Sequence, residues 1–305
     1  MAMTLLEASK LSTDPLKQGI IETFVAESAV LQYLPLLNIA GNAYKYNVEK
    51  TLPGIAWRAV GGTYTESTGV INPVTESLFI LGGLAYTDRA LVLTQGNGAD
   101  LRAHSAKMKA KAASLEFTRN FFKGDNGTSP NQFDGLENRL TGAQVVDQGA
   151  TSGGDALTLA KLDQMIDQVV GGPDVLFMNK TLRRKVNALM RAEGQATETV
   201  SDVFGRQIPA YAGIPIGVIE NDSTDTAILG FTEDNPGGGT AASTSIYAVR
   251  FGVDEYVSGL QTKEGIDVED LGLVGVTYQT LVEWLCGMGV FHPKAAARLQ
   301  GIKNA

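Results

Sequence analysis

Histidine and cysteine, the side chains that most often act as bases and nucleophiles near neutral pH, are rare in this chain. His104 lies in a segment expected to be helical, His292 directly precedes a proline, and Cys286 lies in an apolar stretch. The chain contains neither a G-x-S-x-G nor an H-E-x-x-H sequence. A nucleophile paired with a histidine base would depend on one of two poorly placed histidines, so we expect no enzyme activity.

Glycine-rich and acidic segments could in principle hold a phosphate or a cation. The glycines at 237–239 lack the Lys-Ser or Lys-Thr pair of a phosphate-binding loop, and those at 171–172 precede a strand-like run instead of opening a helix. Residues 254–270 carry six acidic side chains against one Lys, without the spacing of a calcium loop. We interpret these segments as turns and as a solvated loop with a strand, and we expect no catalytic, cofactor-binding or metal site.

Two clusters of cations could contact nucleic acid. One comprises Lys107, Lys109 and Lys111, and the other covers residues 180–185. Solvated helix faces or salt bridges between subunits are the more common origin of such clusters. The net charge of −8 also argues against tight binding to a phosphate backbone, which depends on Lys and Arg.

The composition is that of an ordered globular chain. Its 305 residues are 44% hydrophobic and 19% charged, enough for one large domain or two smaller ones with a real core. The N-terminus does not resemble a signal peptide, and no apolar window is long enough for a membrane span. The single cysteine excludes a disulfide within the chain, so synthesis in a reducing cytoplasm is expected.

A long hairpin is predicted in the first third of the chain. Asp14 and Pro15 indicate the start of a helix over about 15–29, and residues 44–52 then alternate apolar and polar side chains. A segment rich in Gly, Thr and Ser follows, and a return strand is expected from Leu78 to Val92. With about 13 residues in each direction, the tip could project ~40 Å, which a neighbouring subunit could support.

One long amphipathic helix is predicted over residues 100–123. Leu101, Met108, Leu115 and Phe122 recur at seven-residue spacing and form its expected buried stripe. Glycine at 124 ends it.

An α/β pattern begins at Thr151. We expect helices from Thr158 and after Asn179, on either side of a buried strand at 175–178. Further strands are predicted over the following ranges: 213–219, 227–231, 245–249 and 274–290.

The order of these elements resembles the major capsid protein of tailed bacteriophages, whose fold is shared with herpesvirus capsid proteins and encapsulins. No single motif is chemically diagnostic, and the resemblance depends on the order of many short segments across nearly the whole chain. They are Glu22–Leu31, Leu36–Ala43, 44–93, 100–123, Gly124-Asp125, Gln132–Leu136, Leu176–Val186, Tyr211–Ile216 and Phe291–Ala296.

This resemblance implies an α+β fold with an N-terminal arm, an extended β-hairpin loop, a long spine helix in a peripheral domain, and an α/β axial domain. The expected boundaries are 1–43 for the N-terminal arm, 44–93 for the extended loop, 94–150 and 251–305 for the peripheral domain, and 151–250 for the axial domain. It also implies a structural subunit of an icosahedral shell that assembles into pentamers and hexamers around double-stranded DNA.

Subunit contacts are expected along the arm and the spine helix. Trp57 and Arg58 are the leading anchors, because aromatic and Arg side chains dominate interface energies. The full set of interface candidates is Tyr44, Tyr46, Trp57, Arg58, Arg119, Lys123, Phe133 and Asp134.

The partners implied by the resemblance are other copies of the chain, a portal, and packaged DNA bound without sequence specificity. Only about 15 residues precede the first expected helix, so a separate scaffolding protein is expected in place of a fused one. Two alternatives remain: an encapsulin-type compartment that encloses protein cargo, and an oligomeric α/β enzyme with an assembly arm.

Overall fold

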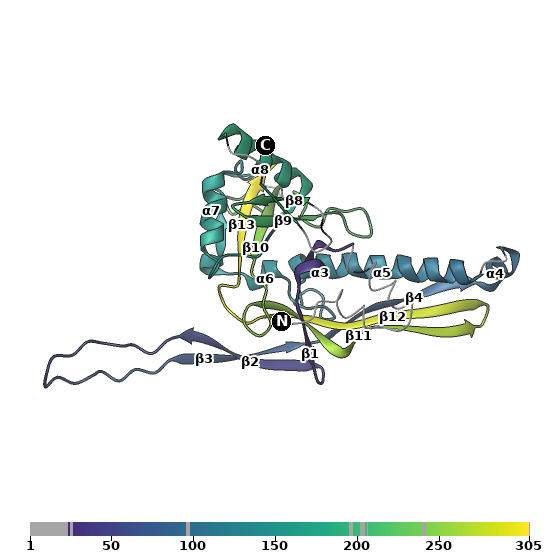
Figure 1. The fold of residues 1–305 in the computed structure, drawn as a ribbon, viewed down its shortest axis with the longest axis horizontal. Coiled ribbons are helices and arrows are strands. Elements are labelled where there is room, and N and C mark those ends of the chain that lie inside the picture. The colour runs from purple at the N-terminus through teal and green to yellow at the C-terminus, as the bar shows by residue number, and fades with distance from the viewer. Residues whose placement is uncertain are drawn as a thin grey trace.

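The computed structural model describes residues 24, 27–95, 98–194, 198–201, 205, 207–239 and 242–304. The helix expected over 15–29 lies mostly outside these residues. The described part contains three β-sheets arranged around one long helix (Figure 1). In chain order the elements are α3 (Ala29–Tyr33), β1 (Leu36–Ile39), β2 (Ala43–Thr51), β3 (Val70–Ser77), β4 (Phe79–Asp88), α4 (Arg89–Gln95), α5 (Gly98–Lys123), α6 (Leu136–Arg139), η1 (Gly142–Gln144), β5 (Val145–Asp147), α7 (Leu159–Asp167), β6 (Val175–Asn179), α8 (Lys180–Ala192), β7 (Glu198–Ser201), β8 (Gln207–Tyr211), β9 (Ile214–Ile219), β10 (Ser243–Val249), β11 (Val257–Val274), β12 (Thr277–Val290) and β13 (Ala296–Lys303).

The predicted projection exists, but its second strand lies earlier than expected. Strands β2 and β3 form a two-stranded antiparallel sheet that projects away from α5, and we call residues 43–77 the arm and 52–69 the arm tip (Figure 1). The return strand predicted from Leu78 is instead β4, which pairs with β12, and Arg89 begins a helix. The alternating pattern in residues 79–88 correctly predicted a strand. The strand that β4 pairs with lies about 200 residues away, and a local pattern cannot identify such a distant partner.

A four-stranded sheet in the order β1-β11-β12-β4 supports the long helix. Strands β11 and β12 form a hairpin that turns at Gly275, so the acidic segment is a strand and the apolar strand expected from 274 begins at Thr277. Asp267 and Glu269 are exposed on one face of β11, with Val268 half-buried between them. The sequence predicted the solvent-exposed face of this segment, but it did not predict that the segment pairs with β12.

Helix α5 confirms the predicted spine helix and ends before Gly124. The predicted stripe does not match its buried face, since Met108 is 60% exposed while Ala106, Ala110 and Phe117 are buried. A strict seven-residue repeat drifts around a straight α-helix by about 20° per repeat, so it does not follow one face. Small alanines line the helix where it packs closely.

The seven-stranded sheet has the order β5-β13-β10-β6-β9-β8-β7. Strands β6, β9 and β10 and helices α7 and α8 fall where the sequence predicted them, and Asn179 Oδ1 accepts a hydrogen bond of 2.8 Å from the Leu182 amide as the N-cap of α8. The segment 227–231 is a buried turn with only an isolated bridge at Ala227, so the strand predicted there is wrong. Ile228 and Leu229 are buried there without strand pairing.

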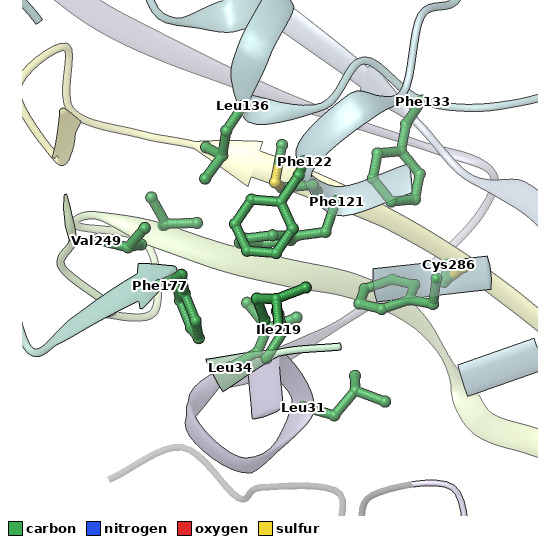
Figure 2. Packing of buried hydrophobic residues seen from close by; sticks show 14 of the residues in the cluster. Leu31, Leu34, Phe121, Phe122, Phe133, Leu136, Phe177, Ile219, Val249 and Cys286 are labelled. Atoms are coloured by element: carbon green, nitrogen blue, oxygen red, sulfur yellow. The ribbon is translucent and has the colours of Figure 1, made fainter. Parts of the chain in front are cut away.

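The sheet separates two hydrophobic cores, and β6 contributes to both. Leu176 and Met178 face α7 and α8, whereas Val175 and Phe177 face the end of α5. Successive side chains of a strand point to opposite faces, so a fully apolar strand is required where both faces are covered. Figure 2 shows the core on the α5 side, where Phe121 and Phe122 lie near Phe177.

The C-terminal strand β13 was not anticipated. It pairs antiparallel with β10 and parallel with β5, so Ala296–Lys303 lies in the seven-stranded sheet. The sequence predicts this segment in the peripheral domain. The domain boundaries remain a proposal, and a definition based on sheets would place β5 and β13 with the axial domain.

Candidate assembly interface

The root of the arm is anchored by an aromatic cluster. Tyr44 and Tyr46 stack with ring centroids 6.2 Å apart, and Phe291 lies 4.5 Å from Tyr46 and 6.0 Å from Tyr44. The Tyr44 hydroxyl donates to Asp254 Oδ1 at 2.8 Å, and that of Tyr46 donates to the Val290 carbonyl at 3.1 Å. Burial, together with nearby Glu76, raises the pKa of Tyr46. These residues attach the arm to its own subunit.

An ion pair reinforces this root. Arg139 on α6 binds both carboxylate oxygens of Glu76 on β3, with Nη2 2.7 Å from Oε2, and both side chains are largely buried. Burial alone would lower the pKa of Arg139, but the hydrogen bond and charge of Glu76 outweigh it and raise that pKa. A bidentate pair fixes orientation as well as distance, so it sets the direction of the arm.

The arm tip has almost no contact with the rest of the subunit. Trp57 is fully exposed, at 103% of its reference area, and Ile55 and Val60 are similarly exposed. The contacts that Arg58 makes are within the tip, to the Gly62 carbonyl at 3.3 Å and over the Tyr64 ring at 5.3 Å. Large apolar side chains gathered at an unsupported end indicate a surface that is covered in an assembly.

The spine helix presents its candidates in two different settings. Arg119 is exposed and pairs with Glu116 one turn away at 2.9 Å. Lys123 lies 2.8 Å from Glu137 and also binds Glu233. Lys123 is therefore engaged within the subunit, whereas Arg119 remains accessible to a neighbour.

Lys123 belongs to a buried charge network that joins α5 to the seven-stranded sheet. Arg298 on β13 lies 2.8 Å from Glu137 and 2.9 Å from Glu233, so two cations and two carboxylates alternate. Burial tends to raise the pKa of Glu233, but Lys123 and Arg298 outweigh it and hold that pKa below its ordinary value. The network fixes the end of the spine helix against the sheet.

Phe133 and Asp134 lie near the end of the loop between α5 and α6. Phe133 is buried, and Asp134 accepts a hydrogen bond from the Asn126 amide at 2.8 Å. A Cβ at Gly124 would lie 2.3 Å from the Phe133 carbonyl, so only glycine allows this approach. Both residues shape the subunit in this structure.

The structure thus sorts the eight candidates into groups. Tyr44 and Tyr46 meet at the arm root, Lys123, Phe133 and Asp134 hold the spine turn, and Trp57, Arg58 and Arg119 are exposed. Sequence reasoning missed Glu76, Arg139, Glu233 and Arg298, whose partners lie 63 to 161 residues away. No local spacing signals such pairs.

Catalytic chemistry finds little support among the described residues. They contain no cluster of three His, Cys, Asp or Glu side chains that could hold a metal ion. His104 is exposed on α5, and burial raises the pKa of the Cys286 thiol, which makes it unreactive. None of the helices that the structure describes is both long and apolar enough to cross a membrane.

Comparison with known proteins agrees with this architecture. The family described as "Major capsid protein GP7" matches residues 14–158, which include the arm and the spine helix. A comparison with curated proteins finds no match.

Solved structures share the fold over most of the chain. The holo-SrpI encapsulin complex from Synechococcus elongatus PCC 7942 is 16% identical with a TM-score of 0.66, covering 100% of this chain and 98% of that one. The capsid of an empty GTA particle is 16% identical with a TM-score of 0.61, covering 90% of each chain. Mycobacterium phage Bobi is 14% identical with a TM-score of 0.61, covering 89% of each.

These matches confirm the resemblance to tailed-phage major capsid proteins and the α+β capsid fold. The chain is therefore similar to a major capsid protein family over residues 14–158, and it shares its fold with an encapsulin and with a GTA capsid.

Proposed function

We propose that this chain is the structural subunit of an icosahedral viral capsid, made in the host cytoplasm and resident in the virion. Pentamers and hexamers of it would enclose double-stranded DNA. The observation that carries the proposal is the match of residues 14–158 to a major capsid protein family, because these residues include the arm and the helix on which we expect a neighbour's arm to lie.

Assembly is the proposed mechanism. The arm of each subunit lies on the spine helix of the next, and heterologous contacts of this kind close into rings when the rotation allows. Tyr44 and Tyr46 direct the arm, while Trp57 and Arg58 make the contact. Lys123, Phe133 and Asp134 contribute by holding the receiving platform.

The proposed partners are other copies of the chain, a separate scaffolding protein, a portal and packaged DNA. The net charge of −8 favours DNA that moves freely against the wall instead of binding tightly to it. A capsid interior lined mainly by Lys and Arg would contradict this part of the proposal.

Electron microscopy of the purified protein tests the proposal directly. We expect hollow shells tens of nanometres across, formed by the chain alone or after co-expression with a scaffolding protein. Small oligomers of fixed size under both conditions would contradict it and would favour the enzyme alternative.

An encapsulin-type shell is the second candidate, supported by a structural match that covers the whole chain. The contents of particles isolated from the producing cells separate the two. Nuclease-protected DNA of uniform length would support a viral capsid, whereas a stoichiometric cargo protein without DNA would support an encapsulin.

A further inference from the structure

A small pocket lies beside the C-terminal half of the spine helix. Its apolar walls come from β4, α5, β12 and the turn after α5, and two of them, Phe133 and Cys286, are labelled in Figure 2. The remaining apolar walls are Phe79, Ile80, Leu81 and Phe117. Ile80 is 67% exposed at the mouth, which is unusual for a large aliphatic side chain beside an apolar hollow.

The pocket has room for the six-membered ring of an aromatic side chain. Its volume is about 140 Å³, close to the ~150 Å³ cavity that holds benzene in an apolar protein interior. The side-chain amides of Asn131 and Gln132 lie at the lining and offer carbonyl oxygens to a donor. A ring with an apolar body and an N–H at its edge therefore matches both the walls and the lining.

The arm tip carries such a ring next to a positive charge. Trp57 is fully exposed, and Arg58 follows it directly. The pocket has a carboxylate at its edge, because Glu116 of α5 is one of the lining residues and is partly exposed. Its Oε1 accepts a hydrogen bond from Arg119 at 2.9 Å, so a second cation would share this carboxylate with Arg119. Trp57 and Arg58 together thus match the ring-sized hollow and its acidic edge.

The arm of the same subunit cannot supply this ring. Thirteen residues separate Tyr44 from Trp57, which is ~40 Å of extended chain, and the arm projects away from α5 (Figure 1). The pocket and the tip are therefore complementary surfaces at separate places on one chain. Such a pair makes a heterologous contact between copies.

We infer that the pocket formed by Phe79, Phe117 and Phe133 receives Trp57 of a second copy of this chain, with Arg58 of that copy beside Glu116. This inference deepens the proposed function and rests on it, because the arm must lie on a neighbour. It goes further in assigning the receiving site and the residue that fills it.

Disulfide trapping tests the contact in assembled particles. Both double variants are built on Cys286→Ala, because Cys286 also lines the pocket and could pair with a thiol placed there. The variant Trp57→Cys, Ile80→Cys places one thiol on the tip and one at the pocket mouth, and a disulfide requires their Cα atoms to lie within about 7 Å. We expect mild oxidation to give ladders above the monomer on a non-reducing gel. The matched control Trp57→Cys, Gln164→Cys, also on Cys286→Ala, carries its second thiol on the exposed face of α7 and should remain monomeric on the gel.

The two failures are distinguishable by microscopy of the same samples. Shells without ladders in the Ile80 variant, or equal ladders in both variants, would overturn the inference and leave the proposed function intact. Absence of shells from the unaltered chain, with and without a scaffolding protein, would contradict the proposed function itself.

Substitutions at the tip give an independent readout. Trp57→Ala should raise the critical concentration for assembly at least about tenfold, as expected for an aromatic hot spot, while Trp57→Phe should keep most of the unaltered behaviour. Val60→Ala removes another fully exposed apolar side chain of the tip and should change it less than about threefold. Equal effects of Trp57→Ala and Val60→Ala would mean a general apolar contact and would overturn the pocket assignment.

Discussion

The arm tip and the seven-stranded sheet solve the problem of apolar surface in opposite ways. Strand β6 is buried along its whole length, because α7 and α8 cover one face of the sheet and α5 approaches the other. The tip carries Ile55, Trp57 and Val60 with nearly all of their area exposed. One region completes its core within the subunit, whereas the other can bury its apolar side chains only against another molecule.

The difference teaches where stability and assembly are encoded. Burying apolar area contributes about 25 cal/mol per Å² to whichever process removes it from water. In the sheet that process is folding, and at the tip it is association. Substitutions in the two regions should therefore affect different measurements, and the following experiments test that separation in order of expected effect.

Phe122→Ala should produce the largest loss of folding stability. Phe122 is fully buried at the end of α5, with its ring 5.1 Å from Tyr247 and 5.5 Å from Phe177. Removing the ring should lower the free energy of unfolding of the unassembled subunit by about 3–5 kcal/mol, measured by urea denaturation. Trp57→Ala is the matched variant and should change it by less than about 0.5 kcal/mol. Similar losses for both would contradict the separation.

Glu233→Gln should be the next most damaging substitution. It leaves Lys123 and Arg298 with Glu137 as their one carboxylate in the network, and an uncompensated buried charge costs about 3 kcal/mol. The measurement is again urea denaturation of the subunit. Glu220→Gln is the control, since its pair with Lys180 at 2.7 Å is more than half exposed and should contribute less than about 1 kcal/mol. If Glu233→Gln lowered the free energy of unfolding no more than Glu220→Gln does, the charge network would not be what joins α5 to the seven-stranded sheet.

Arg139→Met should loosen the arm more than it destabilises the body. The substitution removes the bidentate partner of Glu76 and leaves that carboxylate largely buried, at a cost of about 2 kcal/mol. Hydrogen exchange in β2 and β3 should accelerate, whereas exchange in β6 and β10 should remain unchanged. Equal acceleration in all four strands would mean that the arm root and the sheet unfold together.

Acid should remove part of the stability that the charge network provides. The pKa of Glu233 is lowered from 4.5 in the folded subunit, so its contribution is fully present above about pH 4.5 and is lost as the pH falls through the folded value. Urea denaturation between pH 7 and pH 3 should show the unaltered chain and Glu233→Gln converging in acid. A constant difference over that range would contradict this assignment.

Helices were easier to predict from the sequence than strand pairing. Helix α8 begins at a side-chain cap and carries Leu182, Val186 and Met190 on one face, so local pattern predicted it correctly. The sequence predicted β4 as the return strand of the arm, a role that β3 has in the structure. The alternating pattern of β4 does not show which strand it pairs with, and that strand is β12. Helical signals are local, whereas strand pairing connects distant segments.

The candidate interface shows the same limit at the level of side chains. Exposure of Trp57 and Arg58 on a projecting arm followed from composition and alternation. The roles of Lys123 and Phe133 within the subunit could not be predicted in this way, because both depend on contacts with segments that are brought together by folding.

By itself, the sequence determined the apolar and polar alternation of the arm, the spine helix with its glycine stop, and the scarcity of histidine and cysteine. Those features depend on neighbouring residues and on composition. Only the tertiary structure decided which strand pairs with which, that Lys123 meets Glu233, and that a ring-sized pocket lies beside α5. Such contacts join residues many positions apart, and their energies exist only once folding has removed the intervening water.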